Sequence, residues 1–203
     1  RDLQGRISDD LGLLTALTFL RLSENELMAM IPPSLGRLTA LKALALYNNT
    51  LNGTVPDDLG LLTALTWLAL DANALTGTIP SSLAQLTALS ILALNNNTLH
   101  GKIPSDLGLL TKLTFLSLRS NELMGAIPSQ LGNLTALLSL LLYRNSLNGT
   151  IPDDLGLLTE LTYLGLSNNA LTGAIPSSFG QLTALARLVL HNNELKGTIP
   201  AEI

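Results

Sequence analysis

Cysteine is absent from the chain, and aromatic residues make up only 3% of it. A chain without cysteine forms no disulfide and offers no thiolate to a metal, so neither kind of cross-link holds this fold together. Charged residues are scarce too, at 13%, and the net charge is −4. A protein that binds nucleic acid needs a basic stripe or patch, so we exclude nucleic acid as a partner.

Long hydrophobic runs are also missing, although 47% of the residues are apolar. No run approaches the roughly 20 apolar residues that span a bilayer, so we expect no membrane contact by this segment. The chain opens at Arg1 without a basic stretch followed by an apolar one, so we expect no signal peptide in it. Because it stops early in a repeating unit, we expect a fragment or a processed form.

Residue types suited to catalysis are thinly spread. The two histidines, His100 and His191, lie about four repeats apart and cannot share a site. Paired acids such as Asp57 and Asp58 directly follow a proline, and we interpret them as caps of a helical turn rather than as an acid–base pair or a calcium site. No nucleotide-binding loop, zinc-ligand spacing or nucleophile elbow occurs. We therefore expect no enzyme, no cofactor and no metal.

One interval organises the whole chain. The same residue types return every 24 positions without an insertion, which indicates stacked supersecondary units that each contact only their neighbours. We expect residues 1–203 to form a single domain of eight repeats starting near residue 3, plus part of a ninth, with no recognisable cap. The most regular position is an asparagine, found at Asn25, Asn49, Asn73, Asn97, Asn121, Asn145, Asn169 and Asn193.

Each repeat contains the spacing L-x-x-L-x-L-x-x-N, as in residues 65–73. Leu68 and Leu70 are two residues apart, so both point inward from a short strand while Ala69 points outward. Successive copies then stack into a parallel sheet. The asparagine that ends each strand can bond backbone groups of the neighbouring turn that would otherwise be buried unpaired, so we predict a structural ladder of the eight asparagines.

A second segment, L-x-G-x-I-P, precedes a short helical turn in each repeat. A proline biases the residue before it toward extended geometry, so we predict another short strand here. Asp57 or Ser81 follows the proline and is of the type that caps a helical turn, which carries Leu59 or Leu83 inward. Each repeat then offers about seven inward apolar side chains, too few for one repeat to fold alone but enough for eight.

The 24-residue unit L-x-G-x-I-P-x-x-L-G-x-L-T-x-L-x-x-L-x-L-x-x-N-x resembles that of the plant-specific class of leucine-rich repeat proteins, over essentially the whole chain. This class includes receptor-kinase ectodomains, receptor-like proteins and polygalacturonase inhibitors. The resemblance implies an α/β repeat solenoid: a right-handed superhelix with a concave parallel β-sheet, and with short extended segments and 3-10 helical turns on the other faces. It also implies an extracellular or cell-surface module that binds a protein, peptide or glycan without catalysis. The chain departs from the class because it lacks cysteine-paired caps.

The sequence also repeats at a second interval, longer than 24 residues. Residues 51–74 and 147–170 match at 18 of 24 positions, so the chain also looks duplicated at an interval of 96 residues. Outward strand positions carry an aromatic residue in every odd repeat, roughly 10 Å apart by strand spacing. These residues are Phe19, Trp67, Phe115 and Tyr163, with Tyr47 and Tyr143 on the same face and Phe179 at a core position. Aromatic residues often dominate interfaces, although duplication followed by packing between strands also explains the row.

We predict a ligand-binding concave face from these aromatics and the polar residues among them. Arg119 and Arg144, close to Phe115 and Tyr143, form the strongest single patch, because an arginine fork can bind a carboxylate while a ring supplies apolar contact. Ordinary solvated arginines are the alternative. The predicted site is Phe19, Arg21, Tyr47, Trp67, Asp71, Phe115, Arg119, Tyr143, Arg144, Tyr163, Arg187 and His191.

Two other surfaces indicate alternative functions. An exposed apolar stripe in the odd repeats would make a self-associating structural protein or a homodimer; it consists of Leu13, Leu61, Leu109 and Leu157. Thr and Asn rows near the G-x-I-P segment would suit an ice-binding or antifreeze protein, although Met and Lys interrupt them; they include Asn52, Thr54, Thr76, Thr78, Asn148, Thr150, Thr172 and Thr198. A consensus-like chain with no ligand is a further alternative.

Five N-x-S/T sequons agree with glycosylation of a secreted protein without establishing it. They begin at Asn48, Asn52, Asn96, Asn133 and Asn148.

Overall fold

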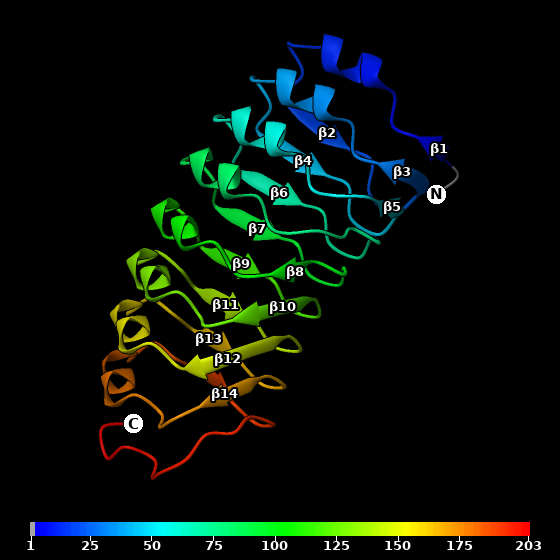
Figure 1. Ribbon diagram of the computed structural model, residues 1–203. Helices are drawn as coiled ribbons and strands as arrows, with labels where there is room; N and C mark the ends of the chain where they lie inside the picture. The colour runs from blue at the N-terminus through cyan, green and yellow to red at the C-terminus, as the bar shows by residue number, and fades with distance from the viewer. Residues whose placement is uncertain (1–2) are drawn as a thin grey trace.

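The computed structural model describes residues 3–203 as one continuous stack of repeats (Figure 1). A typical repeat contributes a strand of a main sheet, an extended segment and a 3-10 helix. The stack curves, with the 3-10 helices along the outer side of the curve. This arrangement confirms the α/β repeat solenoid that the 24-residue interval predicts.

The main sheet has eight parallel strands whose order follows the chain from β2 to β15. Its register equals the repeat, so Trp67 lies opposite Ala43 on one side and Ile91 on the other. Each outward side chain is therefore flanked by its counterparts in the neighbouring repeats. The strands are β2 (Phe19–Arg21), β4 (Ala43–Ala45), β6 (Trp67–Ala69), β7 (Ile91–Ala93), β9 (Phe115–Ser117), β11 (Ser139–Leu141), β13 (Tyr163–Gly165) and β15 (Arg187–Val189).

The G-x-I-P segments pair into two further parallel sheets, of three and four strands, so this region is extended as predicted. Between the two sheets a bridge joins Thr54 to Thr76, and backbone hydrogen bonds continue from segment to segment, as from the His100 N–H to the Gly77 carbonyl at 2.8 Å. The first sheet contains β1 (Gln4–Arg6), β3 (Glu26–Met30) and β5 (Thr50–Asn52). The second contains β8 (His100–Gly101), β10 (Glu122–Gly125), β12 (Ser146–Thr150) and β14 (Ala170–Thr172).

The 3-10 helices begin one residue earlier than a capping role for Asp57 or Ser81 requires. Pro56 is the N-cap residue of the third helix and no side chain caps it, because Asp57 is already the first helical residue. The interpretation of these residues as caps is therefore wrong; Asp57 instead accepts a hydrogen bond from Ser82 Oγ of the next repeat, at 3.1 Å. The helices are η1 (Asp9–Leu13), η2 (Pro33–Arg37), η3 (Asp57–Leu61), η4 (Ser81–Gln85), η5 (Ser105–Leu109), η6 (Ser129–Asn133), η7 (Asp153–Leu157) and η8 (Ser177–Gln181).

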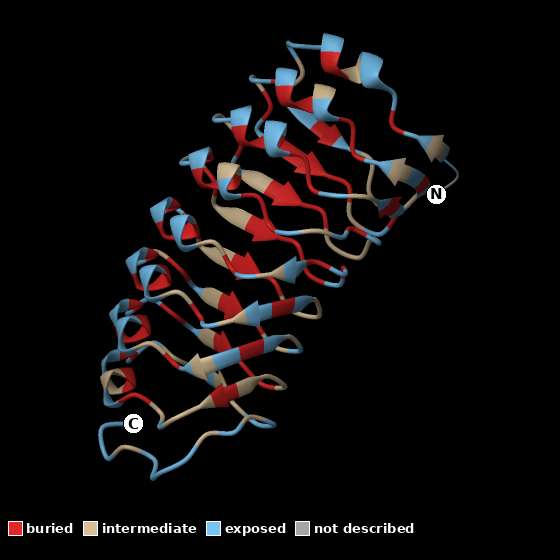
Figure 2. Ribbon diagram, in the orientation of Figure 1, coloured by how far each residue is buried: buried red, intermediate tan, exposed pale blue. Residues whose placement is uncertain are grey.

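Buried residues lie in the strands, the 3-10 helices and the segments between them (Figure 2), and most are aliphatic. In the third repeat seven of them are at most 3% exposed, the number that the sequence predicts, and Phe179 is buried as well. The seven are Leu51, Val55, Leu59, Leu62, Leu65, Leu68 and Leu70.

The repeated asparagines connect neighbouring turns through their side-chain amides. Asn73 Oδ1 accepts a hydrogen bond from the Leu51 N–H at 3.0 Å, and Asn73 Nδ2 donates to the carbonyls of Leu46 and Leu70, each at 3.1 Å. Backbone groups that would be buried without a partner are satisfied in this way.

The fourth residue of each 3-10 helix is the point where neighbouring helices touch. A Cβ added at Gly60 would lie 2.5 Å from the carbonyl oxygen of Ser82 in the next helix, so glycine is required for close contact. In η4 this residue is Ala84, and η4 and η5 pack less closely than the other neighbouring pairs of described 3-10 helices. Among residues 3–203, no helix is long and apolar enough to cross a membrane.

Candidate functional site

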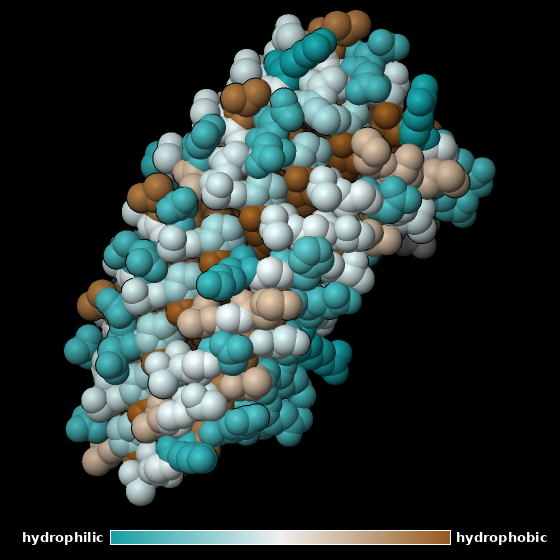
Figure 3. Space-filling model, in the orientation of Figure 1, coloured by the Kyte–Doolittle hydropathy of each residue, from teal (hydrophilic) through white to brown (hydrophobic). Residues whose placement is uncertain are grey.

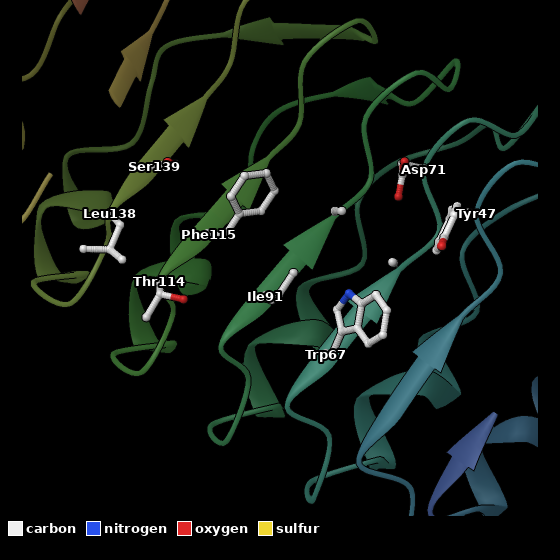
Figure 4. A pocket seen from close by; sticks show the side chains of 10 residues that line it. Tyr47, Trp67, Asp71, Ile91, Thr114, Phe115, Leu138 and Ser139 are labelled. Carbon is white, nitrogen blue, oxygen red and sulfur yellow. The ribbon is translucent and has the colours of Figure 1, made fainter. Parts of the chain in front are cut away.

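The outward face of the main sheet carries a cavity of about 470 Å³, which we call the aromatic cavity. Trp67 from β6 and Phe115 from β9 stand on either side of β7, whose Ile91 and Ala93 form the floor between them (Figure 4). Tyr47 and Asp71 lie further along the strands, beyond Trp67. The lining residues are Tyr47, Trp67, Ala69, Asp71, Ile91, Ala93, Thr114, Phe115, Leu138 and Ser139.

Six residues of the aromatic cavity are absent from the predicted site: Ala69, Ala93, Ile91, Thr114, Leu138 and Ser139. The signal for them was present, because the two alanines stand between the inward leucines of L-x-x-L-x-L-x-x-N and the other four fall on the two positions that follow its first leucine. They lack an aromatic ring or a charge, which were the features that marked candidates there. Ala69 does point outward as predicted, yet it is only 3% exposed because neighbouring side chains cover it.

Asp71 is the one acidic residue that lines the aromatic cavity. Burial disfavours its charged form and raises the pKa of its carboxyl above the usual 3.8, while a hydrogen bond from its own backbone and the charge of Arg119 partly offset this rise. Within residues 3–203, no other side chain hydrogen-bonds or ion-pairs with this carboxylate. Asp71 is therefore an acceptor available to a cationic group.

A second cavity, of about 330 Å³, lies on the same face toward the C-terminal end, and we call it the basic cavity. It brings together five of the predicted site residues: Arg119, Tyr143, Arg144, Tyr163 and His191. Ser167, Asn168 and Val189 complete the lining. No acidic residue lines it, so it offers cationic donors beside two aromatic rings.

Arginines on this face stack on aromatic rings. Arg119 Cζ lies 5.4 Å from the centre of the Tyr143 ring, and Arg187 Cζ lies 5.8 Å from that of Tyr163. Distances below about 6 Å are those of cation–π contacts. The predicted patch of Arg119, Arg144, Phe115 and Tyr143 is therefore divided, because Phe115 lines the aromatic cavity and the other three line the basic cavity.

The remaining predicted residues flank the cavities. Arg21 Cζ lies 5.7 Å from the centre of the Phe19 ring and 5.1 Å from that of Trp67, so its guanidinium sits between two rings. Phe19, Arg21 and Arg187 line neither cavity.

Four exposed leucines, Leu13, Leu61, Leu109 and Leu157, end every second 3-10 helix on the outer side, with exposures from 52% to 66%. The helices between them end in polar residues: Arg37, Gln85, Asn133 and Gln181. Figure 3 shows apolar side chains as isolated points along this edge. The leucines thus form separate patches rather than a continuous stripe, and self-association through them stays a prediction.

The Thr and Asn rows lie along the G-x-I-P segments, away from the main sheet. Met28 and Met30, each more than half exposed, interrupt them on β3, and His100 interrupts them on β8. The five sequon asparagines are all exposed, and their glycosylation stays a prediction.

His100 lies on β8 of a G-x-I-P sheet whereas His191 lines the basic cavity, so the two histidines are on different faces. The described part of the chain contains no group of three His, Asp or Glu side chains that could hold a metal ion.

Short parallel strands stacked at a fixed interval, with cavities and aromatic residues on the outward face of their sheet, define a repeat solenoid with a binding surface. A family profile of leucine-rich repeats matches residues 63–123, and a related one matches residues 16–38 and 160–182. The chain belongs to the leucine-rich repeat family, and its repeats are of the plant type. No curated protein sequence matches it at a significant level.

Solved structures are similar over nearly the whole chain. The plant peptide hormone receptor RGFR1, in complex with RGF2, has a TM-score of 0.98 and 37% identity, covering 99% of this chain and 32% of that one. The Arabidopsis receptor kinase HAESA, in complex with the peptide hormone IDA and the co-receptor SERK1, has a TM-score of 0.94 and 37% identity, covering 100% and 34%. A plant ice-binding protein has a TM-score of 0.80 and 29% identity, covering 98% and 72%. The chain spans about a third of the length of these two receptor structures.

Proposed function

We propose that this chain is a non-enzymatic recognition module that binds an extended peptide along the outward face of its main sheet, outside the cell or at its surface. The observation that carries the proposal is the presence of two chemically different cavities on one continuous face. Phe115 lines the apolar one, and Arg119, four residues further along the same strand line, faces the basic one.

A peptide suits this surface because successive side chains can differ in charge and polarity. The aromatic cavity takes one large side chain, and the basic cavity takes an anionic group through arginine forks. The receptors RGFR1 and HAESA, which share the fold and are each 37% identical to this chain over the aligned part, are solved with RGF2 and with the peptide hormone IDA. Five exposed sequons are in keeping with an extracellular location.

Screening the chain against a displayed library of random decapeptides and against a glycan array tests the proposal. We expect peptide binders whose affinity falls at least tenfold in the double variant Trp67→Ala/Phe115→Ala, since buried aromatic anchors typically supply about 2 kcal/mol or more each. Leu61→Ala is the matched control, because it removes an exposed apolar side chain from the outer edge. Binders only on the glycan array, or peptide binders indifferent to the double variant, would contradict the proposal.

Ice binding is the second candidate, favoured by the similarity to a plant ice-binding protein and by Thr54 and Thr76, which are bridged on neighbouring segments. Methionines and charged residues on the same segments break the regular rows that this function uses. We therefore expect no inhibition of ice recrystallisation by the wild-type chain. If the wild-type chain inhibits ice recrystallisation and Thr54→Val or Thr76→Val removes the inhibition, ice binding becomes the preferred function over peptide recognition.

A further inference from the structure

At one place on the main sheet, the gap between two aromatic rings is filled by a guanidinium of the chain itself. Phe19 and Trp67 lie on β2 and β6, which are separated by one strand, β4. The guanidinium of Arg21 stands between the two rings, 5.7 and 5.1 Å from their centres. Beneath this gap the outward residues of β4, Ala43 and Ala45, are only 3% and 0% exposed. An arginine side chain thus fits between aromatic residues spaced two strands apart on this face.

The next gap along the row has the same frame without the arginine. Trp67 and Phe115 are again separated by one strand, β7. Ala69 stands two residues after Trp67, where Arg21 stands two residues after Phe19. The methyl group of Ala69 is too short to fill the gap between the two rings, so the aromatic cavity of about 470 Å³ lies there. That volume is ample for one long side chain of a ligand.

The second gap also has a feature that the first one lacks. Asp71 lines it with a half-buried carboxylate that no other described side chain hydrogen-bonds or ion-pairs with, although the charge of Arg119 acts on it. A planar guanidinium can stack on Trp67 or Phe115 and donate two parallel hydrogen bonds to one carboxylate, which a lysine ammonium cannot do.

We propose, building on the peptide-binding function above, that the aromatic cavity takes an arginine side chain of the ligand, with its guanidinium held by Trp67, Phe115 and Asp71. The aliphatic stem then packs on Ile91 and Ala93, the floor of the cavity shown in Figure 4.

Asp71 is the charged residue that lines the cavity, so the cavity itself favours a cation. Arg21 stacks on Phe19 and Trp67 and Arg119 stacks on Tyr143, so neither lines the cavity, although the charge of Arg119 acts on the Asp71 carboxylate from outside it. A neutral apolar side chain would cover the Asp71 carboxylate without pairing it, which is costly. An anionic group would face Asp71 directly, and the basic cavity is the place for it.

The single tryptophan of the chain, Trp67, reports on this cavity without any label. We would titrate N-acetyl-arginine methylamide and follow the indole N–H resonance of Trp67 and the backbone amides. N-acetyl-citrulline methylamide has nearly the same shape without the charge, and the corresponding lysine compound has the charge without the planar fork. We expect the arginine compound to bind at least about tenfold more tightly than either, because citrulline lacks the charge that strengthens hydrogen bonds to Asp71 and lysine lacks the planar pair of donors.

Two variants complete the test. Asp71→Asn keeps the shape of the cavity and is expected to weaken the arginine compound about tenfold while leaving the citrulline compound unchanged. Ala69→Arg places in the second gap the guanidinium that Arg21 places in the first, and is expected to abolish binding with all three lining groups still present. Because Arg21 is accommodated at the equivalent position, this variant is expected to fold, which circular dichroism checks.

Equal affinity for the arginine, citrulline and lysine compounds, or indifference to Asp71→Asn, would overturn the arginine assignment. The peptide library distinguishes this failure from that of the proposed function. Binders that need Trp67 and Phe115 but show no preference for arginine would reject the arginine assignment and keep peptide recognition.

Discussion

Replacing Asn97 by alanine measures how much the asparagine ladder stabilises the middle of the solenoid. Asn97 is only 8% exposed. Its Oδ1 accepts a hydrogen bond from the Leu75 N–H at 3.0 Å, and its Nδ2 donates to the carbonyls of Leu70 and Leu94, each at 3.1 Å. Alanine removes all of these bonds.

The cost divides unequally among the groups that lose a partner. The two carbonyls each keep another donor, from the ladder asparagines on either side, Asn73 and Asn121. Among residues 3–203 the Leu75 N–H has no other hydrogen bond, and a buried polar group left unpaired costs about 1–3 kcal/mol. With the lost net bonds of the amide, we expect Asn97→Ala to lower the free energy of unfolding by about 2–4 kcal/mol. That corresponds to a fall in Tm of roughly 5–15 °C for a chain of this size.

Urea unfolding followed by circular dichroism, with the slope checked for constancy, gives this free energy. Asn25→Ala is the matched control at the end of the ladder, where the bond from the Leu3 N–H to Asn25 Oδ1 is longer, at 3.3 Å, and exposed. We expect it to cost less than about 1 kcal/mol, because water replaces the lost partner. Equal effects of the two substitutions would refute the reasoning that burial of the orphaned N–H sets the cost.

Four further substitutions test local features. Ala29 has a φ of 67°, whereas the other eight repeats have glycine at this place, so Ala29→Gly is expected to stabilise the fold by about 1 kcal/mol in urea unfolding. Gly60→Ala is expected to destabilise it by about 1–3 kcal/mol, since the new Cβ must push the Ser82 carbonyl away; an unchanged midpoint would show that the helices separate freely. Ser117 Oγ is buried without a partner among the described residues, so Ser117→Ala is expected to be neutral or stabilising by up to about 1 kcal/mol. Burial raises the pKa of Asp71, so its contribution to stability is full below the unfolded pKa and is lost as the pH rises through the folded pKa; Asp71→Asn should raise Tm at neutral pH and not below the unfolded pKa.

The sequence predicted most of what depends on spacing alone. The inward leucines, the outward aromatics and the exposed Leu61 all follow from their place in the repeat, and the structure has them where the spacing puts them. The grouping of outward residues into two cavities could not be predicted, because it depends on side-chain directions. Arg119 turns onto Tyr143 and away from Phe115, and no spacing rule states this. The capping role of Asp57 failed because a preceding proline takes the N-cap position.

Ala84 marks the place where the two halves of the duplicated chain join. It lies in the last repeat of the first 96-residue half, and its counterpart in the second half, Gly180, is a glycine. Loose packing of η4 against η5 on the outer side therefore marks the seam between the two halves. The aromatic cavity straddles the same seam, since Trp67 belongs to the first half and Phe115 to the second.

The two rings that enclose this cavity come from different halves, but each half also contains a pair of aromatic residues two repeats apart: Phe19 and Trp67 in the first, Phe115 and Tyr163 in the second. Joining two copies therefore added, at the seam, one more gap of the same width to those within the copies. The side chains distinguish the gap at the seam, because Ala69 stands where Arg21 fills the first gap and Asp71 has Ser167 as its counterpart in the second half.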